Sequence, residues 1–293
     1  MQNLSDQKIQ DLAIHANDIR VSIVEMLLAA KSGHTAGPLG MADIFTLLYF
    51  HTMKHDPKRP DWADRDRLVL SNGHICPVLY ATMAHRGYMP VKELLTLRQF
   101  GSRLQGHPHR EFMPWVENSS GPLGSGLSQA VGMALADRID NGVNSDKTIY
   151  ALLSDGEHDE GNTWEAVLLA GKEKLRNLIA IVDRNNIQID GYTESVMPLG
   201  DLALKYENFG WHTQEIDGHN FEEINNAINQ AKAVFDKPSV IIARTIPGRG
   251  VAMFERDYRW HGYDPNGKSA VADYNEALKE LRTLGGKIKS EHE

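Results

Sequence analysis

Residues 148–187 carry the pattern that indicates the fold class, and they read TIYALLSDGEHDEGNTWEAVLLAGKEKLRNLIAIVDRNNI. The stretch opens with an apolar segment, 148–155, continues with segment 162–175, and ends with a second apolar segment, 177–184. Short apolar runs bounded by turn residues predict strands, and the longer middle segment predicts a helix. Two strands joined through one helix form a βαβ unit with parallel strands. This stretch therefore predicts a parallel sheet.

The alternation of strands and helices continues on the C-terminal side of this unit. Further segments of the same kind cover residues 202–210, 211–217, 221–234 and 238–246. Alternating elements of this kind are typical of α/β folds with a parallel sheet. We therefore expect one doubly wound, mostly parallel α/β domain over residues 1–284, with helices on both faces, and a frayed charged tail over 285–293.

The N-terminal half supplies further elements of the same domain. Apolar residues spaced by three or four predict a long helix over 9–27, which begins near an imperfect capping box of Ser5 and Lys8. We expect a short helix over 42–50 and a short strand within 67–74. In the helix expected after Gly121, small residues recur every four positions and predict close backbone packing; they are Gly124, Ser128, Gly132 and Ala136.

Composition excludes several classes of protein. The chain has 293 residues, 41% of them hydrophobic and 24% charged, which are ordinary globular values. With 31 basic and 39 acidic residues, the net charge of −8 disfavours a general nucleic-acid binder. One cysteine, Cys76, excludes an intramolecular disulfide framework and favours a reducing, cytoplasmic location. We predict neither a membrane span nor a secretory signal, because no long apolar run and no basic N-terminal region are present.

Hard oxygen ligands follow both strands of the βαβ unit. Asp155 ends the first strand, and Asn185 follows the second. The carboxyl ends of neighbouring parallel strands meet at one edge of a sheet, where such folds bind ligands. Carboxylate, amide and backbone carbonyl oxygens suit Mg²⁺ or Ca²⁺. A shared metal site is one interpretation, and a plain turn with a strand cap is the other.

Two segments match nucleotide-binding motifs in their letters. Residues 262–269, GYDPNGKS, fit the P-loop pattern, but no apolar strand precedes them, so a turn before the last helix is the favoured interpretation. The segment GPLGSGLSQ has Gly124 and Gly126 but Gln129 in place of the third glycine of the dinucleotide fingerprint. NAD binding is therefore only weakly indicated.

Several segments together resemble the transketolase family. SDGEHDEG and NLIAIVDRNNIQIDG are similar to its thiamine-diphosphate motif, with Ser154 in place of the motif's first Gly. KSGHTAGPLGM, RLVLSNGH, GSRLQGHP, GPLGSGLSQAVGMA and RWHG follow the family order and extend the resemblance over nearly the whole chain. It implies the diphosphate-binding domain of that family.

The resemblance assigns cofactor contacts residue by residue. It implies that Asp155, Asn185 and the carbonyl oxygen of Ile187 hold the metal that bridges to the diphosphate, Mg²⁺ first and Ca²⁺ or Mn²⁺ as alternatives. It also implies an amide contact from Gly156. The full set of implied thiamine-diphosphate contacts is His74, Gly121, Leu123, Asp155, Gly156, Asn185, Ile187 and His261.

The catalytic residues that the resemblance implies are mostly histidines. His34, His107 and His261 are similar to the histidines at the substrate end of the family's channel, and Glu160 to the glutamate that couples its paired active sites. A ketol transfer polarises a carbonyl and moves hydroxyl protons, and imidazole both donates and accepts protons near neutrality.

Other residue patterns have simpler interpretations. The remaining histidines are taken as turn or core residues, and a zinc site at His107 and His109 has no cysteine partner to support it. Cys76 lies two residues after His74, which would suit a Cys–His pair. A small buried apolar residue is the favoured interpretation.

The resemblance covers only the N-terminal, diphosphate-binding part of the family. The pyrimidine-binding domain, whose carboxylate contacts the cofactor's aminopyrimidine, and the C-terminal domain have no counterpart among the 293 residues. We therefore expect a partner subunit that supplies them, in a heterotetramer of two such chains and two partners. The chain alone is expected not to turn over.

The resulting expectation is the diphosphate-binding subunit of a two-chain transketolase, which moves a two-carbon ketol unit from a ketose or its phosphate to an aldose or its phosphate. Pentose phosphates are the default substrates, and a branched or sulfonated ketose is an alternative. Three other functions stay open: the α subunit of a thiamine-dependent 2-oxoacid dehydrogenase, a non-catalytic cofactor-binding protein, and a P-loop nucleotide hydrolase.

Overall fold

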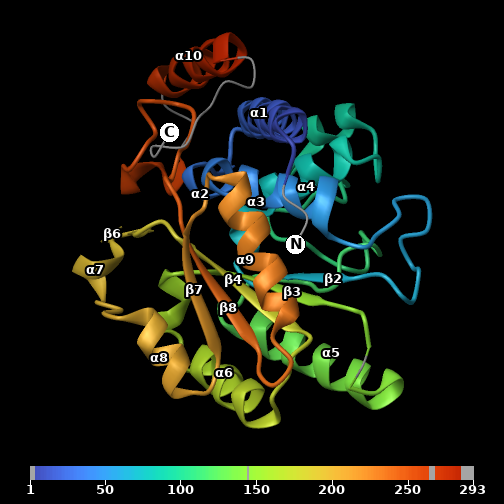
Figure 1. Cartoon of the computed structure of the whole chain (residues 1–293). Helices are drawn as coiled ribbons and strands as arrows, with labels where there is room; N and C mark the ends of the chain where they lie inside the picture. The colour runs from blue at the N-terminus through green and yellow to red at the C-terminus, as the bar shows by residue number, and fades with distance from the viewer. Residues whose placement is uncertain (1–3, 144, 264–267, 285–293) are drawn as a thin grey trace.

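The centre of the fold is a five-stranded parallel sheet. The computed structural model describes residues 4–143, 145–263 and 268–284. The strands lie in the order β2-β3-β4-β8-β7, so β4 is central (Figure 1). Their bounds are β2 (Arg67–Leu70), β3 (Ile149–Ser154), β4 (Leu178–Arg184), β7 (His212–Asp217) and β8 (Ser239–Arg244). All four pairings are parallel, as the βαβ pattern predicted.

Helices cover both faces of this sheet (Figure 1). On one side, α9 (Phe221–Ala233) contacts β7 and β8, and α3 (Ala42–Leu47) and α4 (Cys76–His85) lie beside it; α1 (Asp6–Ala30) packs on these helices, and α10 (Lys268–Leu284) packs on α1. On the other lie α5 (Ser125–Asn141), α6 (Gly161–Glu173) and α8 (Leu202–Asn208). The short helices α2 (Ala36–Gly40) and α7 (Thr193–Val196) lie in connections. The predicted doubly wound α/β class is confirmed.

Side chains of the central strands alternate between two hydrophobic cores. In β3, Tyr150 and Leu152 join the core beneath α1, α4 and α9, whereas Ala151 and Leu153 join the core beneath α5 and α6. Strand side chains point to opposite faces with a period of two, so a strand buried on both faces is apolar throughout. This is why residues 148–155 form a continuous apolar run.

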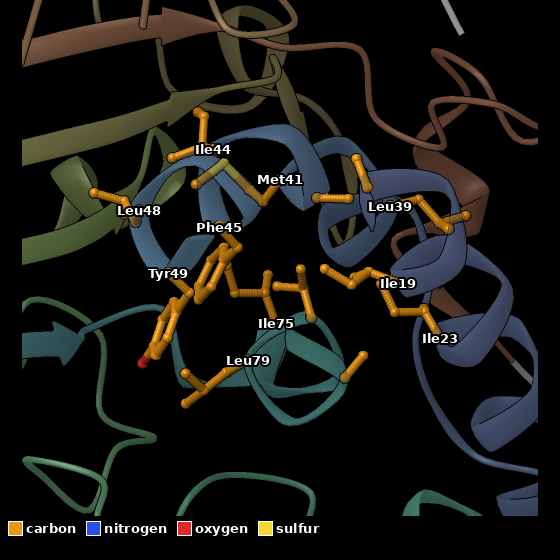
Figure 2. Close-up of a cluster of buried hydrophobic side chains, with 14 of the residues drawn as sticks. Ile19, Ile23, Leu39, Met41, Ile44, Phe45, Leu48, Tyr49, Ile75 and Leu79 are labelled. Atoms are coloured by element: carbon orange, nitrogen blue, oxygen red, sulfur yellow. The ribbon is translucent and has the colours of Figure 1, made fainter. Parts of the chain in front are cut away.

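The first core extends into a cluster between helices. Ile19 and Ile23 of α1 face Leu39 of α2, Phe45 of α3 and Leu79 of α4, all of them buried (Figure 2). This packing fixes α2 and the start of α4 against α1. Both flank segments that carry candidate site residues.

The N-terminal expectations hold with one extension and one correction. Ser5 caps α1, since its hydroxyl accepts a hydrogen bond from the Lys8 amide. The short helix expected over 42–50 is α3, which continues as a π-helical turn over Leu48–Thr52. The correction concerns the small-residue stripe of α5: Ser128, Gly132 and Ala136 are exposed, and no atom of a neighbouring segment lies near a Cβ built on Gly132. The helix buries a different face, because Leu127, Val131 and Ala134 lie against the sheet.

Two short antiparallel pairs lie outside the main sheet. β1 (Gly33–His34) pairs with β9 (Gly262–Tyr263), which sets His34 opposite Gly262. β5 (Ile187–Gln188) pairs with β6 (Gly191–Tyr192) directly after β4. The first pair joins segments more than two hundred residues apart, and the second shapes the loop that follows Asn185.

Candidate active site

The carboxyl ends of β3 and β4 lie side by side and form the floor of the candidate site. Ser154 pairs with Asp183 in the sheet, and the Asp155 amide donates to the Asp183 carbonyl oxygen at 3.1 Å. Asp155 and Asn185 therefore leave the sheet as neighbours, as the sequence predicted.

The Asp155 carboxylate is fully buried and held by donors. Its Oδ1 accepts from the Gly156 amide at 2.7 Å, and its Oδ2 accepts from the Asn186 amide at 2.7 Å and from Arg184 Nη1 at 3.0 Å. Burial raises the pKa of Asp155, and the Arg184 guanidinium opposes this rise. A buried carboxylate of this kind gains from a nearby cation.

Asn185 is oriented by a buried neighbour. Its Nδ2 donates to Asp183 Oδ2 at 2.8 Å, and its Oδ1 accepts from the Ile187 amide at 3.0 Å. Asp183 also accepts a short hydrogen bond from the Thr245 hydroxyl, and burial raises the pKa of Asp183 to about 7. The predicted metal ligands Asp155, Asn185 and Ile187 thus lie within one hydrogen-bonded loop pair. Their oxygens are hard donors of the type that Mg²⁺ prefers.

Four histidines converge beside this floor. His74 follows β2, the neighbour of β3, while the β1–β9 pair brings His34 next to His261. The ring centroids of His34 lie 5.0 Å from His74, 5.4 Å from His261 and 6.3 Å from His107. His74 and His261 are 5.2 Å apart. The structure therefore brings together every histidine that the sequence analysis assigned to the site.

The histidine rings are neutral at pH 7. Burial, with the neighbouring His261, Arg98 and His107 adding to it, lowers the pKa of His34 from 6.5 to about 3. Burial also lowers the pKa of His261 to about 4 and that of His74 well below its ordinary value. Burial and the Arg98 charge lower the pKa of His107. Neutral imidazoles each offer one donor and one acceptor to a ligand.

Buried polar atoms without partners line the same region. In the described part of the chain, His34 Nδ1, the Ser120 hydroxyl and both polar atoms of the Asn72 side chain accept and donate no hydrogen bond. Asn72 is fully buried, and a Cβ on Gly73 would lie 2.5 Å from the Ser120 hydroxyl, so these groups are close neighbours. Buried polar groups are nearly always paired, so this cluster fits a polar ligand such as a cofactor.

Gly121 and Leu123 lie on the loop immediately before α5. A Cβ on Gly121 would lie 3.9 Å from the His107 ring, which puts Gly121 at the edge of the histidine cluster. The Leu123 carbonyl oxygen accepts from Asn162 Nδ2 at 3.3 Å, and its side chain is half-buried. Both predicted contacts therefore lie on the loop that adjoins the site.

Glu160 is separate from the cluster. It is exposed and immediately precedes α6, where its side chain makes no capping hydrogen bond. The structure does not place it among the histidines. A role in coupling would therefore act through another surface.

Three residues near the site were not singled out from the sequence. Glu157 is a fully buried carboxylate beside Asp155, Arg184 reaches Asp155, and Arg98 lies beside His34 and His107. The Arg98 guanidinium packs against Gly106, where a Cβ would lie 2.7 Å from its Nε. No spacing rule signals these contacts, because most of them join residues that are far apart in the sequence, such as Glu157 with Ser71 and Arg184 with Asp155.

The nucleotide motifs do not form nucleotide sites in the described residues. Of the P-loop match over 262–269, residues 264–267 lie outside the described residues, and 262–263 belong to β9 rather than to the central sheet. In GPLGSGLSQ, the amides of Gly124 and Gly126 donate to Glu157 and Ser71. These amides are therefore not free for a dinucleotide phosphate.

The structure disfavours a reactive thiol at Cys76 and a zinc site at His107 and His109. Cys76 is buried, its thiol donates to the Gly106 carbonyl oxygen, and burial raises its pKa to about 12, so it is not a reactive thiolate. Within residues 4–143, 145–263 and 268–284, no three His, Cys, Asp or Glu side chains are arranged to hold a metal ion. This counts against zinc at His107 and His109. Across the same ranges, no helix has the length and apolar character of a membrane span.

The parallel sheet, its oxygen-lined edge and the adjoining histidine cluster define the class of thiamine-diphosphate-binding α/β domains. Residues 12–279 match the thiamine diphosphate binding domain of transketolase. The chain belongs to the transketolase family.

Relatives of similar length are transketolase subunits. The chain is 44% identical to a 6-deoxy-6-sulfo-D-fructose transketolase subunit of Clostridium sp. (strain MSTE9), covering 92% of this chain and 98% of the relative. It is 36% identical to an apulose-4-phosphate transketolase subunit of Phocaeicola vulgatus, covering 97% and 99%. The prediction of a transketolase subunit is confirmed, and these matches favour it over a 2-oxoacid dehydrogenase α subunit.

Solved structures agree with the assignment. Transketolase from Leishmania mexicana superposes with a TM-score of 0.82 at 33% sequence identity, and the match covers 98% of this chain but 45% of that protein. The chain therefore corresponds to slightly less than half of that longer transketolase.

Proposed function

We propose that this chain is the diphosphate-binding subunit of a two-chain transketolase that moves a two-carbon ketol unit from a ketose to an aldose. The observation that carries the proposal is the gathering of His34, His74, His107 and His261 beside the sheet edge that holds Asp155 and Asn185. Ligand-binding oxygens and neutral proton donors and acceptors share one site there.

The proposed cofactor site uses the floor of this edge. Asp155, Asn185 Oδ1 and the Ile187 carbonyl oxygen would hold Mg²⁺, and the diphosphate and water would complete its shell. The hydrogen bond from Asn185 to Asp183 supports this assignment, because it turns the amide oxygen away from the carboxylate. Bound thiamine diphosphate would supply the carbanion stabilisation that a ketol transfer needs.

The histidines are proposed to bind and orient the sugar. Their low pKa values keep the rings neutral at pH 7, so each ring can donate to a carbonyl or hydroxyl oxygen and accept from a hydroxyl. The unpaired Nδ1 of His34 supports a direct contact with a ligand. His107 is exposed, which suits a residue at the mouth of the site.

A partner subunit is part of the proposal. It would supply the pyrimidine-binding half, and a heterotetramer would pair two sites. The outer face of α6 supports this, because Glu160 immediately precedes the helix and the apolar residues Leu168 and Leu169 on it are 56% and 42% exposed. We place the enzyme in the cytoplasm, consistent with the single thiol, Cys76.

The substrate class follows from the reaction and the relatives. The relatives' names specify 6-deoxy-6-sulfo-D-fructose in one case and apulose 4-phosphate in the other. We propose a ketose or ketose phosphate as donor and an aldose or aldose phosphate as acceptor for this chain, with pentose phosphates, a sulfonated ketose and a branched ketose phosphate as the panel to assay.

Native mass spectrometry of the protein, gently purified from its source with Mg²⁺ and thiamine diphosphate, tests the proposal. We expect a complex that contains a second polypeptide and bound cofactor. This complex is then assayed for ketol transfer with each sugar of the panel. A chain found alone and without cofactor contradicts the proposal. Binding without turnover on any sugar of the panel would instead indicate a non-catalytic cofactor-binding protein.

A further inference from the structure

The buried carboxylate of Glu157 joins three segments of the site. Its Oε1 accepts a short hydrogen bond from the Ser71 hydroxyl and one of 2.9 Å from the Gly124 amide. Its Oε2 accepts from the Ser154 amide at 2.9 Å and from the Ser154 hydroxyl at 3.4 Å. Glu157 is 0% exposed, and no lysine, arginine or histidine of the described ranges forms an ion pair with it. Hydrogen-bond donors alone therefore compensate for the burial of this carboxylate.

Each donor belongs to a segment that carries proposed cofactor residues. Ser71 follows β2 and precedes His74 by three residues. Gly124 follows Leu123 on the loop before α5, and Ser154 ends β3 immediately before Asp155. Ser71 and Gly124 lie 86 and 33 residues from Glu157 in the sequence, and both donate to its Oε1.

Glu157 also replaces a missing helix cap. Gly124 is the N-cap of α5 with a left-handed φ of 78°, and it has no side chain to cap the helix. The Glu157 carboxylate accepts a hydrogen bond from the Gly124 amide, and the Ser71 hydroxyl oxygen accepts one from the Gly126 amide at 3.2 Å. A negative charge at the N-terminus of a 17-residue helix is stabilised by the helix dipole. The start of α5 is thereby fixed to β2 and to the loop after β3.

The backbone at the start of α5 lies very close to the neighbouring segments. A Cβ on Gly126 would lie 2.5 Å from Ser71 Cα, and one on Gly124 would lie 1.9 Å from Asn162 Oδ1. The glycines of GPLGSG therefore allow α5 to contact the neighbouring segments rather than a dinucleotide. Ser154, which stands where the family motif has Gly, adds a hydroxyl toward the same carboxylate.

We propose that Glu157 is a positioning residue that sets the segments of His74, of Gly121 and Leu123, and of Asp155 relative to one another. This inference rests on the proposed function, because it assumes that these segments share one cofactor. Glu157 itself does not contact the cofactor. It acts through the backbone of Gly124 and Ser154.

The test compares two amide variants at opposite ends of α5. Glu157→Gln replaces one accepting oxygen by an NH₂ group, which leaves a buried donor unpaired. Asp137→Asn is the control: Asp137 is a buried carboxylate at 8% exposure near the other end of the helix, where it accepts from Asn141 and Asn177 and pairs with Lys147 at 3.4 Å. Ser71→Ala is a second variant, which removes one donor and keeps the carboxylate.

Two measurements are made on the unsubstituted protein and each variant. Hydrogen–deuterium exchange of the full chain reports on segments 71–76, 121–127 and 152–156. Calorimetric titration of the complex with thiamine diphosphate at fixed Mg²⁺ gives the affinity. We expect Glu157→Gln to increase exchange in all three segments and to weaken binding about tenfold to a hundredfold, as for partners of metal ligands in general. Ser71→Ala should weaken it less, and Asp137→Asn not at all.

The outcomes separate this inference from the proposed function. If Glu157→Gln binds the cofactor as tightly as the unsubstituted complex, or changes exchange no more than Asp137→Asn does, the positioning role is refuted while the cofactor site stands. If the unsubstituted complex binds no cofactor, the proposed function fails, and the inference fails with it.

Discussion

Replacing His34 by asparagine should make the protein less sensitive to acid. In the folded chain, burial and the neighbouring His261, Arg98 and His107 lower the pKa of His34 from 6.5 to about 3. Because the folded-state pKa lies below the unfolded-state value, the unfolded chain binds a proton first as the pH falls. The stability that neutral His34 preserves is therefore present above pH 6.5 and is lost progressively between pH 6.5 and about 3.

The two pKa values give the size of the effect. Between them, each proton taken up only by the unfolded chain lowers the free energy of unfolding by about 1.4 kcal/mol per pH unit. With values of 6.5 and about 3, the contribution of His34 falls by about 2 kcal/mol from pH 7 to pH 5. His34→Asn has no such proton to take up, so its loss of stability over this range should be smaller by that amount.

Urea unfolding followed by circular dichroism at pH 7.0, 6.0 and 5.0 measures this difference. His51→Asn is the control, since His51 is an exposed histidine outside the cluster and its replacement should change the pH dependence much less. If the unsubstituted protein and His34→Asn lose the same free energy between pH 7 and pH 5, the neutral buried state of the histidine cluster is refuted.

Three further predictions concern the metal site and the P-loop match. Asp155→Ala should weaken Mg²⁺-dependent binding of thiamine diphosphate on the order of a hundredfold, because it removes the charged ligand, and unchanged affinity in calorimetry would contradict the site. Arg184→Gln should tighten Mn²⁺ binding without cofactor about fivefold, because it removes roughly 1 kcal/mol of repulsion near Asp155; EPR spectra showing weaker binding would instead make Arg184 a structural support of that carboxylate. Lys268→Ala should leave cofactor affinity and activity within about twofold, since no central strand precedes the match, and lost activity in a folded protein would revive a nucleotide site.

Much of the fold follows from local sequence pattern. The apolar runs over 148–155 and 177–184 predicted adjacent parallel strands, and their register then placed Asp155 beside Asn185. The strand order was not predictable, because β8 inserts between β4 and β7 through long-range pairing. The prediction of close packing along the small residues of α5 was wrong, since small size does not specify which face of a helix contacts the sheet.

The site residues were predictable only where a sequence motif or a strand end marks them. The histidines came from a family resemblance, since no spacing rule brings His34 to His261; the β1–β9 pairing does so. Glu157 and Arg98 were not predictable, because in a sequence a buried carboxylate or a packed guanidinium cannot be told from a charged residue on the surface. Their partners become visible only when the three-dimensional contacts are known.

Mixing experiments test whether ketol transfer needs both this chain and a partner subunit. The chain and its partner subunit are purified separately, and ketol transfer from a ketose phosphate to an aldose phosphate is measured for each alone and for the mixture, with and without Mg²⁺ and thiamine diphosphate. We predict transfer by the mixture only, and only when both Mg²⁺ and the cofactor are present. Transfer by the chain alone, or an inactive mixture with bound cofactor on every sugar of the panel, would contradict this prediction.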